Sequence, residues 1–298
     1  MSIEGEHLHP SIRPLLSESA EARIQRIRSD RWIAYARAES VVGSLEELLQ
    51  YPKRTRMPNL LIVGPTNNGK TMIVEKFRRA HSPIRATESK DGVAHVPVVR
   101  IQMPAGPDER RFFGAMLEAV GMFTRTPERL AVRQDLAIRV ARETDIRILV
   151  VDEVHNLLAG TSVQQRCLLN LLRWIGNELQ IPIVAVGTAE ALHAIQSDDQ
   201  LANRFEPVGL PVWHDGAEFR QLLNTLESVL PLCRPSRLST AGIALTILSM
   251  SEGILGEIVA IVSRAAIHGI RSGSESVGGT EIDAIGFLPP SQRRHVTV

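Results

Sequence analysis

The sequence has few cysteines, few aromatic residues and no long apolar run. Cys167 and Cys233 are its two cysteines, and neither has a second cysteine or a histidine at zinc-ligand spacing, which argues against a zinc site. Both lie in apolar helical patterns, so we expect buried free thiols in a reducing cytoplasm. No stretch approaches the roughly 20 apolar residues of a membrane-spanning helix. We therefore expect a cytoplasmic protein without a membrane partner.

Lysine is almost missing from the positively charged residues. Of 34 lysines and arginines four are lysines, which leaves 34 − 4 = 30 arginines, yet the formal net charge is only +1. Such a balance excludes a global attraction to nucleic acid, so any basic binding surface must be local. Arginine binds phosphate and carboxylate in a bidentate way, which suits a protein that meets phosphates. Codon bias explains the excess equally well.

One loop carries the strongest functional signal. The segment 64–71 (GPTNNGKT) fits G-x-x-x-x-G-K-[ST] in full and follows the apolar run 60–63 (LLIV). A strand, a glycine loop and a helix in this order form a phosphate-binding loop, whose backbone N–H groups point at phosphate oxygens. We expect Lys70 to bind the β and γ phosphates and Thr71 to hold Mg²⁺. The predicted nucleotide-binding residues are Gly64, Pro65, Thr66, Asn67, Asn68, Gly69, Lys70, Thr71 and Met72.

Two later strands end in residues that suit the same chemistry. The run 148–153 (ILVVDE) ends in Asp152, expected to orient Mg²⁺ through water, and Glu153, expected to polarise the attacking water. The run 184–188 (VAVGT) ends in Thr188, which can bond the attacking water or the γ phosphate if its strand adjoins the phosphate-loop strand. An N-cap of the following helix is an equally good interpretation of Thr188, and both roles can hold. No lysine lies in an [NT]-K-x-D setting, which favours ATP over GTP.

Apolar runs without alternation divide the chain. Strands are expected near residues 60–63, 96–102, 146–151, 181–186 and 208–210, separated by helices at 71–79, 108–121, 127–143, 163–179 and 189–196. This alternation predicts an α/β fold with a parallel sheet covered on both faces. Three helices follow, at 217–230, 240–250 and 254–270. We predict a helical extension at 1–58 (helices 18–35 and 44–50), an α/β domain at 59–214, an all-α lid at 215–275 and a flexible tail at 276–298.

Two arginine-bearing segments are candidates for contact with a DNA backbone. The segment 100–111 leaves the second strand and contains Arg110 and Arg111, and the helix 127–143 displays arginines that include Arg129 and Arg133. Arginine contacts to phosphate give affinity without sequence information. Solvated helix faces with partners at i+4 explain each of these residues equally well.

These elements together resemble the AAA+ ATPases. The resemblance rests on the phosphate loop, on 149–155 (LVVDEVH), on Gly187-Thr188 and on 203–205 (NRF), where Arg204 stands at the position of an arginine finger or forms a surface salt bridge. The segment 57–71 (MPNLLIVGPTNNGKT), together with 31–35 (RWIAY), is similar to the TniB family of transposition ATPases, related to TnsC and more distantly to MuB. The likeness runs from about Ile24 to about His268.

The resemblance implies a fold and a function. It implies a P-loop AAA+ core with a helical lid, ATP and Mg²⁺ as ligands, and assembly of rings or filaments on double-stranded DNA. Such an assembly would recruit a TniA-like DDE transposase and contact a TniQ-like adaptor. Asp152 and Glu153 would be the Walker B acids, Thr188 the sensor and Arg204 a finger acting on a neighbouring subunit. No arginine follows Gly256-Glu257 until Arg264, so lid sensing is in doubt and slow hydrolysis is expected.

Two other functions fit the same residues. One is an AAA+ loader or remodelling ATPase for another DNA-processing partner, such as a replication initiator or helicase loader. The other is a scaffold that binds ATP and barely hydrolyses it. About 28 residues follow residue 270, too few for an appended winged-helix module, which favours the transposition ATPase over the initiator.

Overall fold

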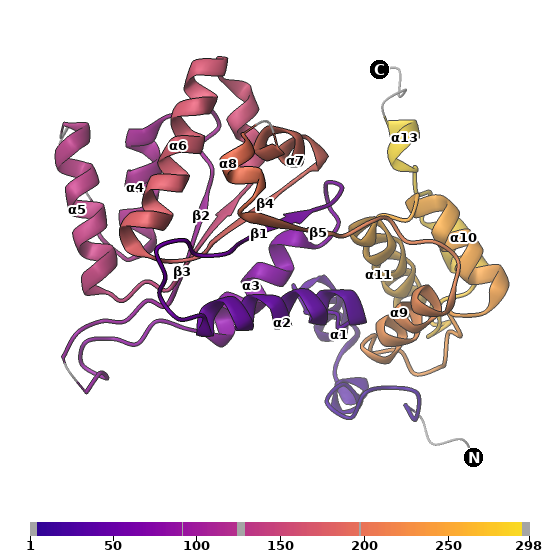
Figure 1. The fold of residues 1–298 in the computed structure, drawn as a ribbon. Coiled ribbons are helices and arrows are strands. Elements are labelled where there is room, and N and C mark those ends of the chain that lie inside the picture. The colour runs from indigo at the N-terminus through magenta and orange to yellow at the C-terminus, as the bar shows by residue number, and fades with distance from the viewer. Residues whose placement is uncertain (1–4, 91, 124–128, 197, 294–298) are drawn as a thin grey trace. The chain divides into compact units, whose positions relative to one another are not determined.

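The computed structural model describes residues 5–90, 92–123, 129–196 and 198–293 (Figure 1). The chain forms two compact units, each with its own core. The α/β unit comprises Ser40–Thr66 and Lys70–Leu210, and the helical unit comprises Met1–Glu39, Asn67–Gly69 and Pro211–Val298. Part of the phosphate-binding loop thus belongs to each unit.

A five-stranded parallel sheet forms the centre of the α/β unit (Figure 1). Its strands are β1 (Asn59–Val63), β2 (Val98–Gln102), β3 (Ile148–Asp152), β4 (Ile183–Gly187) and β5 (Phe205–Gly209). They lie in the order β2-β3-β4-β1-β5, and every neighbouring pair is parallel. Because all strands run the same way, the residues that follow them gather at one edge of the sheet, here called the carboxyl edge. The residues that precede the strands gather at the opposite amino edge.

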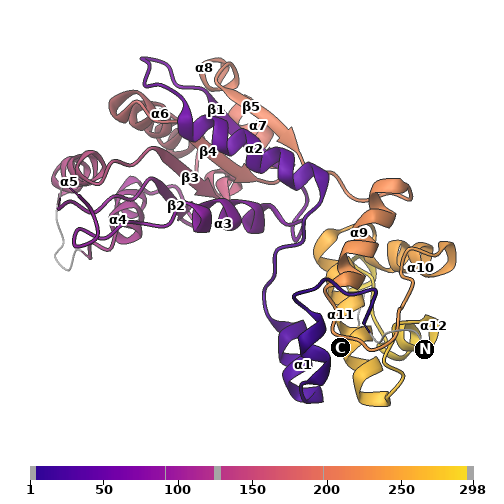
Figure 2. The ribbon, with the colours of Figure 1, turned by 90° about the horizontal axis from the view of Figure 1, so that it is seen from below.

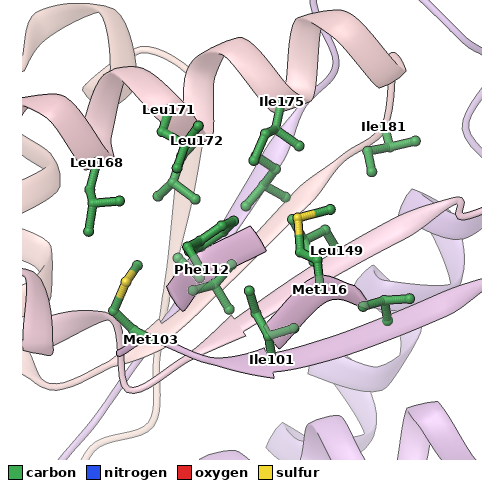
Figure 3. Packing of buried hydrophobic residues seen from close by; sticks show 14 of the residues in the cluster. Ile101, Met103, Phe112, Met116, Leu149, Leu168, Leu171, Leu172, Ile175 and Ile181 are labelled. Carbon is green, nitrogen blue, oxygen red and sulfur yellow. The ribbon is translucent and has the colours of Figure 1, made fainter. Parts of the chain in front are cut away.

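Both faces of the sheet are buried, which explains why its strands are continuously apolar. Successive strand side chains point to opposite faces. Leu61, Ile101 and Leu149 pack into the cluster that Phe112 and Met116 join, and Figure 3 shows part of it. The intervening strand residues are buried as well and lie outside that cluster; they include Leu60, Ile62, Ile148, Val150 and Val184. The expected parallel α/β sheet is confirmed.

Helices cover the two faces of this sheet. They are α2 (Ala36–Gln50), α3 (Lys70–Ala80), α4 (Glu109–Ala119), α5 (Leu130–Glu143), η2 (Val154–Ala159), α6 (Ser162–Leu179), α7 (Ala189–Gln196) and α8 (Asp199–Ala202). Figures 1 and 2 show α2 and α3 on the opposite side of the sheet from α6. The side chains of α6 that enter the core recur at helical spacing, at Leu168, Leu172, Ile175 and Leu179.

The helical unit joins segments from both ends of the chain. It contains η1 (Arg13–Ser17), α1 (Ala20–Arg28), α9 (Ala217–Ser228), α10 (Ala241–Ser251), α11 (Leu255–Ser272), α12 (Gly279–Ala284) and α13 (Pro290–Arg293). Helix α1 lies beside α11 (Figure 2), and its Ile24 and Ile27 are part of the same apolar cluster as Phe219 and Leu223. The Arg23 guanidinium forms a two-pronged ion pair with Glu275 at 2.7 Å.

The ends of the chain differ from the sequence-based expectation. The helix expected over 18–35 ends at Arg28, because Ser29 adopts an extended backbone. The helix expected at 44–50 begins eight residues earlier, at Ala36. Residues after 275, expected to be a flexible tail, place Val277, Ile282 and Phe287 in the apolar cluster of the helical unit. The expected helix start at Pro127 lies outside the described residues, and α5 is described from Leu130.

Both cysteines also differ from expectation. Cys167 is exposed, because it lies on the solvent face of α6 while Leu168 and Leu172 point inward. Cys233 is half-buried and lies in the segment between α9 and α10, with its Sγ 3.9 Å from an Arg23 nitrogen. The prediction of two buried helical thiols was therefore wrong.

Among the residues described, no group of three metal-binding side chains comes together. None of the helices in this part of the chain has the length and apolar character needed to span a bilayer.

Candidate functional site

The loop that leaves β1 begins with a glycine that the packing requires. A Cβ at Gly64 would lie 2.6 Å from the Leu210 carbonyl oxygen, closer than van der Waals contact allows. The Gly64 N–H donates to the Gly187 carbonyl at 3.2 Å, which ties the start of the loop to the end of β4. After it, Pro65 is half-buried and Thr66 is exposed. The loop therefore leaves the carboxyl edge of the sheet between two fixed strand ends.

Lys70 opens helix α3 and is held under the loop. Its side chain is buried, and Nζ donates to the carbonyl oxygens of Gly64 at 2.8 Å and Pro65 at 2.6 Å. Burial lowers the pKa of this ammonium, while the nearby carboxylates Glu153 and Asp152 act in the opposite direction. The ammonium is thus held directly against the first two residues of the loop. Met72, two residues on, is half-buried on α3.

Asp152 ends β3 as the most buried acid of the site. It is 1% exposed, and its Oδ2 accepts hydrogen bonds from the Thr71 hydroxyl at 2.9 Å and from Arg100 at 2.7 Å. Its Oδ1 accepts the Glu153 N–H at 2.9 Å. The structure therefore brings Thr71 and Asp152, 81 positions apart in the sequence, into direct contact.

Glu153 adopts an uncommon backbone conformation beside this acid. Its φ of +55° lies in the left-handed region, which non-glycine residues seldom adopt and which is enriched at functional sites. The side chain is 39% exposed and its Oε2 lies 3.1 Å from His155 Nε2. The carboxylate is thus half-accessible at the carboxyl edge, with a histidine as its neighbour.

Thr188 follows β4, and β4 is the strand that pairs with β1. Val63 and Gly187 are register partners, so Thr188 leaves the sheet beside the start of the phosphate loop. The adjacency on which the sensor hypothesis depends is therefore present. The Thr188 hydroxyl donates to Glu190, which lowers the pKa of that carboxyl, and the Thr188 carbonyl accepts the Ala191 N–H at the start of α7.

The middle of the loop, residues 67–69, contacts the N-terminus of α11 within the helical unit. The Leu255 N–H donates to Asn68 Oδ1 at 3.0 Å, and the Gly256 N–H donates to the Asn67 carbonyl at 2.9 Å. Asn67 Nδ2 donates to Glu257 Oε1 at 3.1 Å. These loop residues satisfy N–H groups that the first turn of a helix leaves unpaired. A change in the loop can therefore alter the start of α11.

Arg204 lies at the amino edge of the sheet. It immediately precedes β5, and its carbonyl accepts the Asn59 N–H at the start of β1 at 2.9 Å. The guanidinium donates to Asn177 Oδ1 at 2.9 Å. Burial lowers the pKa of Arg204, and the positive charges of Arg56 and Arg173 lower it further. The structure thus does not bring Arg204 together with Lys70 and Asp152.

The four candidate DNA-contacting arginines lie on two helices that pack together, α4 and α5. Arg110 and Arg111 are exposed in the first turn of α4, and Arg111 lies 3.7 Å from Asp108. Arg129 is exposed directly before α5. Arg133 is half-buried, with its guanidinium beside Gly114 of α4. Three of the four are therefore accessible, and the fourth helps to pack the two helices.

Sequence reasoning missed the part that Arg100 plays. The segment 100–111 is a candidate for DNA contact, but Arg100 points at Asp152 and forms an ion pair with it. A signal was present, because an arginine in the middle of the apolar run 96–102 needs a partner when its strand is buried. The pairing of β2 with β3 identifies Asp152 as that partner, because it places Arg100 opposite Val150, two residues before Asp152.

The oxygen atoms around Asp152 fit a magnesium ion. Mg²⁺ takes one or two carboxylates together with waters and substrate phosphates, and hydroxyl and carboxylate oxygens are what Thr71 and Asp152 offer. Their direct hydrogen bond places both oxygens at one point beside Lys70. The Arg100 guanidinium contacts the same carboxylate oxygen, so a cation there would share Asp152 with Arg100.

Several solved structures have a similar fold. The ORC2 protein of Aeropyrum pernix (ADPNP-ADP complexes) matches with a TM-score of 0.61 at 13% identity, over 92% of this chain and 72% of that one. The ORC1 protein of the same organism, in complex with DNA, matches with a TM-score of 0.59 at 18% identity, over 88% and 68%. Domain III of the Thermotoga maritima replication initiation protein DnaA matches at 0.54 and 13%, over 95% and 99%. At these identities the likeness establishes the fold, the P-loop AAA+ fold.

The sequence itself matches one family. No curated protein matches the chain. The family model described as the bacterial TniB protein matches residues 23–215, which is more than half of the sequence and includes every loop and strand end of the site. The chain therefore belongs to the TniB family.

Proposed function

We propose that this protein is a transposition ATPase that assembles on double-stranded DNA in the cytoplasm, where both ATP and DNA are present, and there recruits or activates a DDE transposase. The observation that carries the proposal is the meeting of Lys70, Thr71 and Asp152 at one edge of the sheet in a chain of the TniB family. A TniQ-like adaptor is the second protein partner that we propose from that family.

Nucleotide binding follows from the arrangement of the loop. Lys70 is pre-positioned under the carbonyls of Gly64 and Pro65, so its ammonium is available to the β and γ phosphates without a large movement. Thr71 and Asp152 would hold Mg²⁺, which when bound neutralises charge on the phosphate oxygens. The absence of a guanine-recognition lysine favours ATP.

Hydrolysis would use Glu153. A water oxygen attacks the γ phosphorus, the bond from that phosphorus to the bridging oxygen breaks, and Glu153 accepts the water proton. The Glu153 side chain is 39% exposed, so water has access to its carboxylate. Thr188, at the end of the neighbouring strand, is the residue that we propose to orient the water or the γ phosphate. We expect turnover to be slow and stimulated by DNA or a partner.

Arg204 can act only on the nucleotide of another copy. It adjoins the first residue of β1, whereas the phosphate loop follows the last one. Four steps of about 3.3 Å along β1 separate the two edges by about 13 Å. An arginine side chain is shorter than this, and the Arg204 guanidinium is bound to Asn177. The geometry supports a homo-oligomer in which one subunit completes the site of the next.

DNA contact is proposed for the exposed arginines of α4 and α5. Arg110, Arg111 and Arg129 project from one pair of helices and can neutralise backbone phosphates without reading sequence. Arg133 is the weakest of the four candidates, because it is half-buried against α4.

A second candidate function is a loader or remodelling ATPase for another DNA-processing partner. The observation that favours it is the likeness of the fold to the ORC1 protein of Aeropyrum pernix, solved in complex with DNA, and to domain III of the replication initiation protein DnaA. A pull-down with a DDE transposase, compared with a pull-down with a helicase, separates the two functions.

The main test is DNA binding and particle size of the purified protein on random-sequence duplex. Four conditions are compared: ATP, a non-hydrolysable analogue, ADP and no nucleotide. Large cooperative assemblies with ATP or the analogue, absent with ADP and absent in Lys70→Ala, are the expected result. Failure to bind duplex in every nucleotide state would remove autonomous DNA assembly and favour the loader.

A further inference from the structure

A pocket opens at the amino edge of the sheet, away from the phosphate-binding loop. It has a volume of about 660 Å³ and lies entirely within the α/β unit, where the segment before β1 meets the segment before β5. Its polar lining includes Tyr51, Arg54, Arg56, Asn203, Arg204 and Glu206. Pockets of this size hold ligands larger than a single ion.

The arginines of this pocket have neutral partners. Arg54 stacks over the Tyr51 ring at 4.7 Å, and Arg204 bonds to the Asn177 amide oxygen. Arg173, which adds to the positive field at Arg204, bonds to the amide oxygens of Gln200 and Asn170. Among the described residues, no ion pair involves the guanidinium of Arg54, Arg56, Arg173 or Arg204. Glu206, which brings a carboxylate to the lining, forms no ion pair with a described residue either.

Three arginines and one glutamate line this pocket, and the net positive charge favours an anion. The pKa of Arg204 is lowered first by burial and then by Arg56 and Arg173, so these charges repel one another in the folded chain. An anion that enters relieves the repulsion and gains charge-assisted hydrogen bonds. Guanidinium groups match phosphate oxygens in pairs, and several of them around one pocket match a chain of phosphates better than a single one.

We propose that Arg54 and Arg56, together with Arg204, form a pocket that binds the nucleotide phosphates of a second copy of this chain. The inference rests on the proposed function and extends it, because it assigns phosphate binding to the segment between α2 and β1. An arginine finger at Arg204 that acted alone would need neither Arg54 nor Arg56. The pocket cannot serve the chain's own nucleotide, for the reason given for Arg204: it opens at the opposite edge of the sheet.

The shape of the pocket favours nucleotide phosphates over a DNA backbone. Met57, Pro58 and Phe205 give it apolar walls, and Tyr51 holds Arg54 in place from one side. A recessed site with apolar walls admits the end of a phosphate chain more easily than the outside of a duplex. The phosphate could still come from DNA, so the experiment includes that source.

The test uses Arg54→Gln and Arg56→Gln in the full-length chain, with Arg147→Gln as the matched control. Arg147 is exposed and immediately precedes β3, so it lies at the same edge of the sheet but outside the pocket. Both pocket arginines are exposed as well, so the variants should fold, and circular dichroism checks this. Arg56→Lys, which keeps the charge, should retain part of the function.

Three quantities are measured: affinity for a fluorescent ATP analogue in dilute protein, the protein concentration needed for ATP-dependent assembly, and ATP turnover. We expect unchanged affinity, an assembly midpoint raised about tenfold to a hundredfold, as the loss of charged hydrogen bonds predicts, and a similar loss of turnover. Excess Lys70→Ala protein, which keeps an intact pocket but lacks the nucleotide-binding lysine, should restore turnover to either variant.

Each other outcome overturns the proposal in its own way. If the variants lose only duplex affinity and the salt dependence of DNA binding weakens, the phosphates belong to DNA. If Arg54→Gln and Arg56→Gln behave like Arg147→Gln while Arg204→Gln loses turnover, Arg204 acts without them. The proposed function then stands, and the pocket proposal fails. If neither Arg204→Gln nor Lys70→Ala affects ATP-dependent assembly, the proposed function itself fails.

Discussion

Replacing Arg100 by glutamine tests whether this arginine and a bound cation share Asp152. The guanidinium lies 2.7 Å from Asp152 Oδ2, and the carboxylate is 1% exposed, so the change leaves a buried negative charge with the Thr71 hydroxyl and the Glu153 N–H as its hydrogen-bond donors. Without Mg²⁺ and nucleotide, the α/β unit should therefore lose stability.

The size of the loss follows from the contact. Hydrogen bonds to charged groups contribute about 1.5–3 kcal/mol, and we take about 2 kcal/mol because the Arg100 side chain is partly screened by water. That side chain is 29% exposed. For a unit of this size, about 2 kcal/mol corresponds to a fall in Tm of about 4–8 °C.

Magnesium should reverse most of this loss. A divalent cation at Thr71 and Asp152 supplies positive charge to the same carboxylate, and in Arg100→Gln it no longer competes with a guanidinium. The assay is thermal unfolding of wild type, Arg100→Gln and Arg147→Gln, with and without Mg²⁺ and a non-hydrolysable ATP analogue. A deficit of the same size in both conditions would refute the idea that the two cations share Asp152.

Three further predictions concern the loop, the acid and a helix surface. Gly64→Ala should destabilise the α/β unit by about 1–3 kcal/mol in urea unfolding, because its Cβ would meet the Leu210 carbonyl, whereas Gly43→Ala, with open space around it in α2, should be neutral or stabilising. Glu153→Gln should abolish ATP hydrolysis but keep ATP-dependent assembly on DNA, and loss of both would show that hydrolysis drives assembly. The Arg78 hydrogen bond lowers the pKa of Glu75 from 4.5 to about 2, so the pair stabilises the fold above pH 4.5 and this contribution is lost as the pH falls towards 2. Glu75→Gln should lower stability by about 1 kcal/mol at pH 6 and by less at pH 3.5, and an equal loss at both would contradict the assignment.

The sequence predicts the sheet and the carboxyl-edge site well because both are encoded locally. A buried parallel strand is a continuous apolar run, and the residues after it must gather at one edge of the sheet, so the positions of Lys70, Asp152 and Thr188 along the chain are enough to predict that they lie at one edge. The fold adds the strand order, which makes Thr188 a neighbour of the phosphate loop.

What the sequence does not predict depends on contacts between distant segments. Arg100 looks like a surface charge until β2 and β3 pair and bring it to Asp152. Helix α1 looks like part of an extension until Ile24 meets α11, more than 200 residues later. Polarity around 276–293 suggests a tail, yet three apolar residues in it are enough to pack it against the helical unit.

The two edges of the sheet divide the proposed activity between copies of the chain. Groups that would bind and hydrolyse ATP lie at the carboxyl edge, and the arginines that would complete such a site lie at the amino edge, with the length of β1 between them. On this proposal a single chain would bind ATP with its own groups but would lack the arginines that complete the site. Turnover per chain should consequently rise with protein concentration while nucleotide affinity stays constant, and DNA should promote turnover chiefly by bringing copies together.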